Sequence, residues 1–206
     1  MTQTAVVTGG SGGIGSEVVQ QLRDAGWDVM SLSRREGCDV SDEAQVKKAF
    51  GDRRSLHALV HCAAVLIKEP LVDMTAEDWD AQIGSNLRGA FLCSREAFRL
   101  MRERGGSIVF VSSLSGVAGA EKFPGMAAYV AAKSGLAGLT EELAVEGRPL
   151  GIRVNAISPG AVDTPMLRIA GVEGPALRPA DVARVIVWLA SPESAPLSGG
   201  NLRMDP

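Results

Sequence analysis

The strongest constraint on the fold is a glycine-rich stretch that separates a short apolar run from a helical pattern. It reads TGGSGGIG from Thr8 to Gly15, between β-branched residues at 4–8 and a helical pattern that continues to Ala25. Glycine allows a tight turn and a close backbone approach, and the following helix offers free N–H groups at its positive end. This order indicates a pyrophosphate-binding loop, although a plain tight turn also uses glycine. The predicted contacts to a dinucleotide are Gly9, Ser11, Gly13, Ile14 and Gly15.

Strand and helix patterns alternate along the rest of the chain. Strands are expected at 4–8, 28–32, 56–62, 107–112, 152–157 and 199–204, with a very short one at 38–40; helices are expected from 41, at 75–104, 127–146 and 179–190. The strand runs are apolar along their whole length, which is typical of a parallel sheet covered on both faces. The sequence predicts a single doubly wound α/β domain, a Rossmann fold, over residues 1–206.

Composition and charge exclude several classes of partner. The net charge of −3 provides no basic surface for nucleic acid. The longest apolar run, 56–67, is shorter than the roughly 20 residues that cross a bilayer, and no secretory signal opens the chain. The 3 scattered cysteines suit a reducing compartment. We therefore expect a cytoplasmic protein with no nucleic acid or membrane partner.

The residues that read the adenosine ribose are expected about 20 positions beyond the glycines, at the end of the second strand. Ser33, Arg34 and Arg35 occupy that place. An acid there would accept the 2′-hydroxyl and repel a 2′-phosphate, whereas arginine pairs with the phosphate. The sequence therefore favours NADP(H), with NAD(H) as the second choice, over two solvated loop arginines.

Tyr129 and Lys133 stand at i and i+4 on one face of a predicted helix. Tyrosine, with an ordinary pKa of about 10, is a weak acid or base at neutral pH. A nearby ammonium and an oxidised, cationic nicotinamide would favour the phenolate and lower that pKa. This spacing by itself is common by chance, although Tyr129 is the only tyrosine in the chain.

With the glycine loop, this pair makes the chain resemble the short-chain dehydrogenase/reductase family over nearly its full length. The other matching features are Asp39–Val40 at the adenine, the helix asparagine Asn86, Ser113 after a strand, and the segment from Pro159 to Thr164. The resemblance implies cofactor contacts that also include Ala63, Lys133, Pro159, Gly160, Val162 and Thr164.

The resemblance also implies catalytic roles for four residues. Tyr129 is the general acid in carbonyl reduction, or the base in alcohol oxidation, and Ser113 binds the substrate oxygen. Lys133 binds the nicotinamide ribose and lowers the pKa of Tyr129, while Asn86 holds a water that links Lys133 to solvent. Ser112 and Ser115 are the neighbouring alternatives to Ser113. The expected partner is a small carbonyl or alcohol substrate, with apolar pocket residues at Val65, Leu66, Ile67, Val117 and Met166.

Three departures from the family pattern are visible. His61-Cys62-Ala63-Ala64 replaces the usual Asn-Asn-Ala-Gly, and His61 is expected to take over an asparagine's hydrogen bonds. Only Glu36 and Gly37 separate Arg35 from Cys38, so one peripheral helix is expected to be missing. The stretch 165–178 is short where relatives carry a substrate lid. These gaps predict an open site, suited to a bulky or carrier-borne substrate, or closed by a neighbouring subunit.

The two histidines and the fold itself each allow another interpretation. His57 and His61 have the spacing of a zinc pair, but no third ligand is evident, so no metal is predicted. A non-catalytic dinucleotide-sensing or partner-binding protein on the same fold is the alternative function. The resemblance also suggests a homodimer or homotetramer formed through helices 75–104 and 127–146, where Gly135, Ala137 and Gly138 would permit close approach.

Overall fold

The computed structural model of the chain describes residues 2–51 and 53–205. A parallel sheet of six strands forms its centre, in the order β2-β1-β3-β4-β5-β6. The strands are β1 (Thr4–Thr8), β2 (Asp28–Leu32), β3 (Ala58–His61), β4 (Gly106–Val111), β5 (Ile152–Pro159) and β6 (Asn201–Met204). The chain runs outward from β1 to β2 and then returns to the other side of β1, so the carboxyl ends of β1 and β3 form the switch point where such sheets bind ligands.

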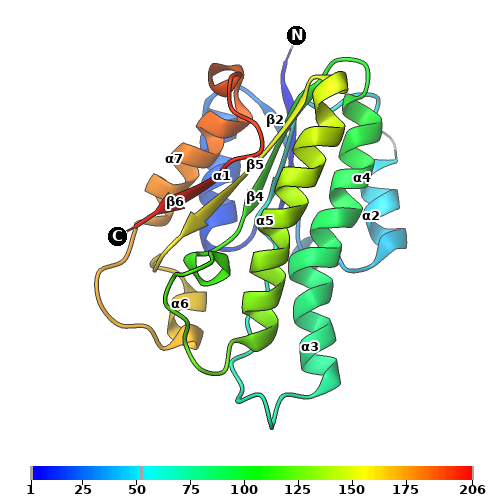
Figure 1. The fold of residues 1–206 in the computed structure, drawn as a ribbon. Helices are drawn as coiled ribbons and strands as arrows, with labels where there is room; N and C mark the ends of the chain where they lie inside the picture. Colours follow the sequence, from blue (N-terminus) through cyan, green and yellow to red (C-terminus); the bar gives the residue numbers. More distant parts are fainter. Residues whose placement is uncertain (1, 52, 206) are drawn as a thin grey trace.

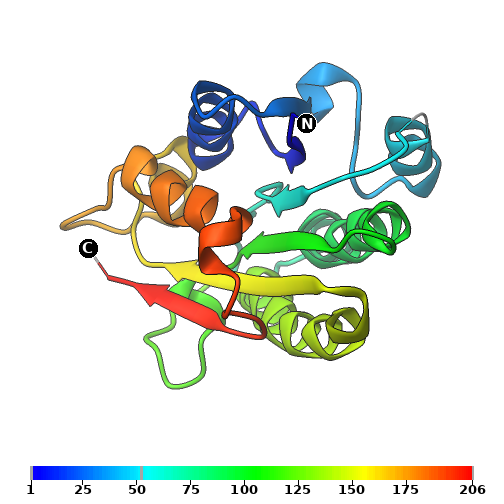
Figure 2. The same ribbon diagram turned by 90° about the horizontal axis from the view of Figure 1, so that it is seen from above.

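Helices cover both faces of this sheet, as Figures 1 and 2 show. One face carries α1 and α7, and the other carries α2, α4 and α5. The helices are α1 (Gly13–Asp24), α2 (Glu43–Phe50), α3 (Ala76–Ile83), α4 (Gly89–Met101), α5 (Ala127–Gly147), α6 (Pro165–Ala170) and α7 (Pro179–Ala190). The predicted doubly wound parallel sheet is confirmed. None of the helices in the described part of the chain has the length and apolar character needed to cross a bilayer.

Two apolar cores explain why the strands lack an alternating pattern. Leu22 of α1 and Ile186 of α7 are fully buried against one face of the sheet. Leu136 of α5 and Phe110 of β4 are fully buried in the core on the other face. Because neither face of the central strands meets water, every position along them favours an apolar side chain.

The long helix predicted over 75–104 is interrupted. Thr75 caps its start, because the Thr75 hydroxyl accepts the amide N–H of Asp78 at 3.1 Å. A π-helical turn, Gly84–Arg88, then separates α3 from α4, and α4 ends at Met101. This turn carries Asn86, which is fully buried.

The connection at 38–40 also differs from expectation. No strand forms at 38–40, because the amide N–H of Asp39 donates to the Gln45 side chain at 2.8 Å instead of to a neighbouring strand. Gly135 of α5 is half-buried and packs against Leu87 of the same chain. A Cβ added to Gly135 would lie 2.8 Å from the Leu87 side chain, whereas one added to Gly138 would meet nothing within 4 Å.

Candidate functional site

A hollow of about 1150 Å³ lies at the carboxyl end of the sheet, between the glycine loop and α6. The predicted cofactor residues all line it, and so do three of the four predicted catalytic residues. They are Gly9, Ser11, Gly13, Ile14, Gly15, Ser33, Arg34, Arg35, Asp39, Val40, Ala63, Ser113, Tyr129, Lys133, Pro159, Gly160, Val162 and Thr164. Asn86 is buried behind its wall, where its neighbour Ser85 lines the hollow.

The glycine loop fits the pyrophosphate of a dinucleotide. Gly9 adopts φ +67°, and a Cβ there would lie 2.7 Å from the backbone nitrogen of Ala63. A Cβ on Gly13 would lie 2.5 Å from the Thr164 side chain. No side chain caps the start of α1, and its first turn holds no acid. Because those N–H groups remain available at the positive end of the helix, the loop suits an anion.

The end of β2 holds a carboxylate that the spacing rule did not indicate. Glu36 Oε2 accepts hydrogen bonds from Ser33 Oγ at 2.5 Å and from Ser31 Oγ at 2.9 Å. Glu36 belongs to a 3-10 turn, Arg34–Glu36, that takes the place of the missing peripheral helix. The sequence feature that could have indicated this contact is the short connection from Arg35 to Cys38, because it requires the chain to turn back immediately after β2.

Tyr129 and Lys133 lie together on α5, facing the carboxyl ends of β4 and β5. Lys133 Nζ donates to the Val111 carbonyl at 2.7 Å and lies 5.5 Å from the centroid of the Tyr129 ring. Ser113 follows β4, and its hydroxyl accepts the Ser115 amide at 3.1 Å. The Ser112 hydroxyl donates to the Lys133 carbonyl at 2.9 Å. This hydrogen bond connects α5 to the end of β4, so the Ser112 hydroxyl has a structural partner.

Burial governs the titration of this pair. It raises the pKa of Tyr129 to about 12, and the neighbouring Ser113 side chain opposes that shift. Burial also lowers the pKa of Lys133 to about 8. The Lys133 charge is not among the causes of this shift, and the expected lowering of the Tyr129 pKa by Lys133 together with an oxidised nicotinamide stays a prediction. The ammonium bonds the Val111 carbonyl, so loss of water around the phenol prevails.

Asn86 joins the π-helical turn to the loop that follows β3. Its side-chain oxygen accepts the Val65 amide at 2.9 Å, and its nitrogen donates to the Val65 carbonyl at 2.8 Å. Both ends of the amide are thus used to hold the cofactor-side loop in place. The water-holding role of Asn86 stays a prediction.

The two histidines bind separate threonines of β1. Thr8 Oγ1 accepts the Ala63 amide and forms a hydrogen bond of 2.9 Å with His61 Nδ1. Burial, and next the Lys133 charge, lower the pKa of His61 to about 3, so the ring is neutral. His57 Nδ1 bonds Thr4 instead. Within the described residues no cluster of three or more His, Cys, Asp or Glu side chains could hold a metal.

A short helix, α6, lies at the Tyr129 end of the hollow, in the stretch where the family's lid is expected to be short. α6 forms because Pro165 suits its first turn and Gly171, at φ +62°, ends it. Met166 Sδ lies 3.9 Å from the Tyr129 hydroxyl, and Lys68 Nζ donates to the carbonyl of Ala170 at 2.6 Å. Leu66 and Met166 line the hollow as predicted, whereas Val65, Ile67 and Val117 do not.

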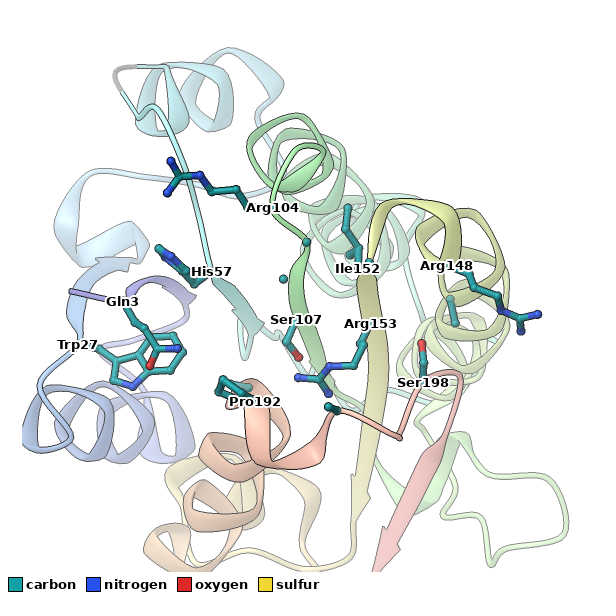
Figure 3. A pocket seen from close by; sticks show the side chains of 16 residues that line it. Gln3, Trp27, His57, Arg104, Ser107, Arg148, Ile152, Arg153, Pro192 and Ser198 are labelled. Atoms are coloured by element: carbon teal, nitrogen blue, oxygen red, sulfur yellow. The ribbon is translucent and has the colours of Figure 1, made fainter. Parts of the chain in front are cut away.

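A second hollow, of about 520 Å³, lies at the amino end of the sheet (Figure 3). Arg153 reaches into it, but its guanidinium donates to the carbonyl of Leu189 in the last turn of α7 and to those of Ser191 and Ser194 beyond it. Arg148 points away from the hollow in Figure 3. Arg153 therefore stabilises the end of α7. The predicted cofactor and catalytic residues lie at the opposite, carboxyl end of the sheet.

Comparison with known proteins agrees with this geometry. A family model described as enoyl-(acyl carrier protein) reductase matches residues 33–206. The chain is 33% identical to a 3-oxoacyl-(acyl-carrier-protein) reductase of Rickettsia bellii, over 98% of this chain and 95% of that protein. It is 32% identical to carbonyl reductase (NADPH) 2 of Sus scrofa, over 98% and 94% of the two chains.

Solved structures show the same likeness. Aldohexose dehydrogenase of Thermoplasma acidophilum superposes with a TM-score of 0.90 at 28% identity, covering 99% of this chain and 92% of that one. A dehydrogenase/reductase of Sinorhizobium meliloti superposes with a TM-score of 0.84, also at 28% identity, covering 100% and 94%. On its sheet topology, its matched family model and these relatives, the chain belongs to the short-chain dehydrogenase/reductase family of oxidoreductases.

Proposed function

We propose that the protein is an NADP(H)-dependent carbonyl reductase, which interconverts a ketone and a secondary alcohol. The observation that carries this proposal is one continuous hollow with two ends. The uncapped glycine loop of α1 lies at one end, and Ser113, Tyr129 and Lys133 lie at the other. A bound nicotinamide supplies the hydride in reduction and accepts it in oxidation.

The chain's own residues handle the substrate oxygen. Tyr129 keeps its proton at neutral pH, because its pKa is raised to about 12, and it is therefore the acid for an oxygen that gains charge. The Ser113 hydroxyl stands beside it as a second hydrogen-bond partner for that oxygen. Lys133, with a pKa of about 8, carries its charge below that pH and is held by the Val111 carbonyl. Asn86 fixes the loop after β3 through the backbone of Val65.

The preference for NADP(H) rests on the end of β2. Arg34 and Arg35 line the hollow and are exposed. They form no ion pair with any other residue that the structure describes, so both guanidinium groups are available to a 2′-phosphate. NAD(H) is the second cofactor in this proposal.

The substrate is a carbonyl compound with an apolar substituent. Tyr129 belongs to a small apolar cluster with Leu66, Met126 and Ala170, against which Phe123 and Met166 pack. A ketone that approaches the hydroxyl of Tyr129 therefore meets side chains that favour hydrocarbon groups.

The proposed function also includes a subunit contact and a cytoplasmic location. We place a homodimer or homotetramer contact on α4 and α5, where Phe91 is 47% exposed and Gly138 has open space above it. The cytoplasmic setting stays a prediction, and the three cysteines are unpaired thiols.

Replacement of Tyr129 by phenylalanine tests the reaction. Tyr129→Phe removes the proton donor and leaves the glycine loop untouched. We expect turnover of ketones with NADPH to fall by about 10²- to 10⁴-fold, while calorimetry shows NADPH binding within about twofold of the wild type. Unchanged turnover would remove Tyr129 from the role of proton donor. A wild-type protein that binds nucleotide and reduces no ketone would favour the non-catalytic dinucleotide sensor.

A further inference from the structure

The buried side of α3 is formed by an amide side chain. Within α3, all of whose residues the structure describes, only Gln82 is buried, and it is fully so. Buried helix positions usually carry apolar side chains, because an amide that leaves water must find hydrogen-bond partners inside the protein. Gln82 Oε1 accepts the Ile67 amide at 3.0 Å, whereas Nε2 has no partner among the described residues. The oxygen is therefore the polar atom of this side chain that the fold uses.

Gln82 and Asn86 hold alternate residues of one loop. Asn86, four residues later in the chain, bonds the amide and the carbonyl of Val65 at 2.9 and 2.8 Å. Gln82 bonds the amide of Ile67. The loop that follows β3 is thus fixed to the α3 side at two points, one on each side of Leu66.

Leu66 belongs to the substrate end of the hollow. It is buried, lines the hollow and packs with Tyr129 and Ala170 in one apolar cluster. The same loop reaches the lid helix α6, because Lys68 Nζ donates to the Ala170 carbonyl at 2.6 Å. The place of Leu66 beside Tyr129, and the link to the lid, therefore depend on where the backbone of residues 65–68 lies.

We infer that Gln82 is a positioning residue, which fixes Leu66 against Tyr129 and thereby limits the room for the substituents of the ketone. This inference rests on the proposed function, because the pocket is that of the proposed reaction. Without the Gln82 oxygen the half-buried Ile67 lacks an acceptor for its amide, and a loop shift that brings this amide to water supplies one. Leu66 moves with the loop, while the cofactor side stays held by the bond from the Ala63 amide to Thr8.

Two substitutions distinguish this role from simple filling of space. Gln82→Met keeps the length of the side chain and lacks a strong acceptor, whereas Gln82→Glu keeps an acceptor oxygen. At pH 6 a carboxyl in so buried a place keeps its proton and resembles the amide. A space-filling role is met by methionine and disturbed by the carboxyl; a positioning role predicts the opposite order.

The measurement is kcat/KM with NADPH, at pH 6, for a series of methyl ketones of increasing chain length. We expect Gln82→Met to change the ratio between the longest and the shortest ketone about three- to tenfold in favour of the longest, mainly through KM, because Leu66 no longer limits the pocket. Gln82→Leu, a second side chain without an acceptor, should behave in the same way. Gln82→Glu should stay within about twofold of the wild type.

Hydrogen exchange and a stability control complete the experiment. Exchange of residues 65–69 and 165–171 needs no turnover, and Gln82→Met should accelerate it in both segments, because Lys68 joins the loop to the lid. The control is Leu22→Ala, which removes a fully buried side chain on the other face of the sheet. It should lower the melting temperature and leave the ketone ratio unchanged.

The remaining outcomes separate the inference from the proposed reaction. If the variants without an acceptor keep the wild-type ratio, or if Gln82→Glu changes it as much as Gln82→Met does, Gln82 only supports the packing of α3 and the inference is overturned. A ratio that shifts equally in Leu22→Ala overturns it as well. If exchange accelerates as expected but the wild-type protein reduces no ketone, the proposed reaction fails, and Gln82 still positions the loop.

Discussion

At the scale of single residues, loss of water decides the state of the catalytic groups. Tyr129 and Lys133 are 7% and 2% exposed, so neither the phenolate nor the ammonium is well solvated. Both groups shift toward their neutral forms: the pKa of the phenol rises and that of the amine falls. At neutral pH Tyr129 therefore keeps its proton, and Lys133, with a pKa of about 8, still carries most of its charge.

The chain's single tyrosine makes this state measurable. We expect the near-ultraviolet phenolate absorbance of the cofactor-free protein to titrate near pH 12, where Tyr129 loses its proton, instead of near the usual value of about 10. An oxidised nicotinamide carries positive charge, so adding NADP⁺ should move the midpoint downward. Circular dichroism recorded in the same titration separates this event from unfolding.

Ser113→Ala provides the control for that titration. The Ser113 side chain lowers the pKa of Tyr129 in the wild type, so its removal should move the midpoint further upward. A wild-type midpoint near 10 while the circular dichroism remains native would contradict the account of a desolvated phenol.

At the scale of elements, two short helical segments shape the site. The π-helical turn Gly84–Arg88 places Asn86 against the backbone of Val65. The lid helix α6 spans only six residues, and an ammonium from another loop holds its last carbonyl. A helix this short has little stability of its own, so Lys68 and the apolar contacts of Met166 keep it over Tyr129.

Lys68→Met tests the role of this contact. The substitution keeps most of the side-chain length and removes the hydrogen bond to the Ala170 carbonyl, an interaction of a charged group worth about 1.5–3 kcal/mol. We expect the KM for the ketone to rise about three- to tenfold with kcat within about twofold, because the lid binds ground state and transition state alike. Hydrogen exchange of residues 165–171 should accelerate.

The control for the lid is Lys48→Met, on the exposed side of α2 and far from α6. It should change neither KM nor exchange in α6. Unaltered exchange of residues 165–171 in Lys68→Met would mean that the apolar cluster alone holds the lid.

At the scale of the whole molecule, the exposed faces of α4 and α5 carry the proposed subunit contact. Phe91 and Val145 are exposed apolar side chains on these helices, at 47% and 59%. Gly138 lies on the same side of the sheet with free space where a side chain would be. A second copy of the chain would bury these groups, and a helix crossing at Gly138 could approach closely.

Gly138→Glu should weaken that association. A charged side chain at a close helix contact adds bulk and a desolvation cost, so we expect sedimentation velocity to show a shift from the oligomer to the monomer. Ala25→Glu, at the exposed end of α1, adds the same group outside the proposed contact and should leave the mass unchanged. If Gly138→Glu also leaves the assembly intact, the contact lies elsewhere.

The sequence by itself determined the features that depend on local spacing. The alternation of strand and helix, the glycine loop and the i, i+4 placement of Tyr129 and Lys133 follow from periodicities within short segments. They were sufficient to predict the parallel sheet, which the structure confirms, and to name residues that line one hollow.

Tertiary structure alone decided what depends on distant segments meeting in space. Glu36 reaches the end of β2 because a turn folds back, and Met166 covers Tyr129 because α6 packs beneath a lysine from another loop. The direction of the Tyr129 pKa shift also depends on the tertiary structure. Burial by the surrounding chain raises this pKa, whereas the i, i+4 spacing to Lys133 alone predicts that it is lowered. Desolvation and long-range contacts arise only when distant segments pack together, so they cannot be predicted from any short segment of the sequence.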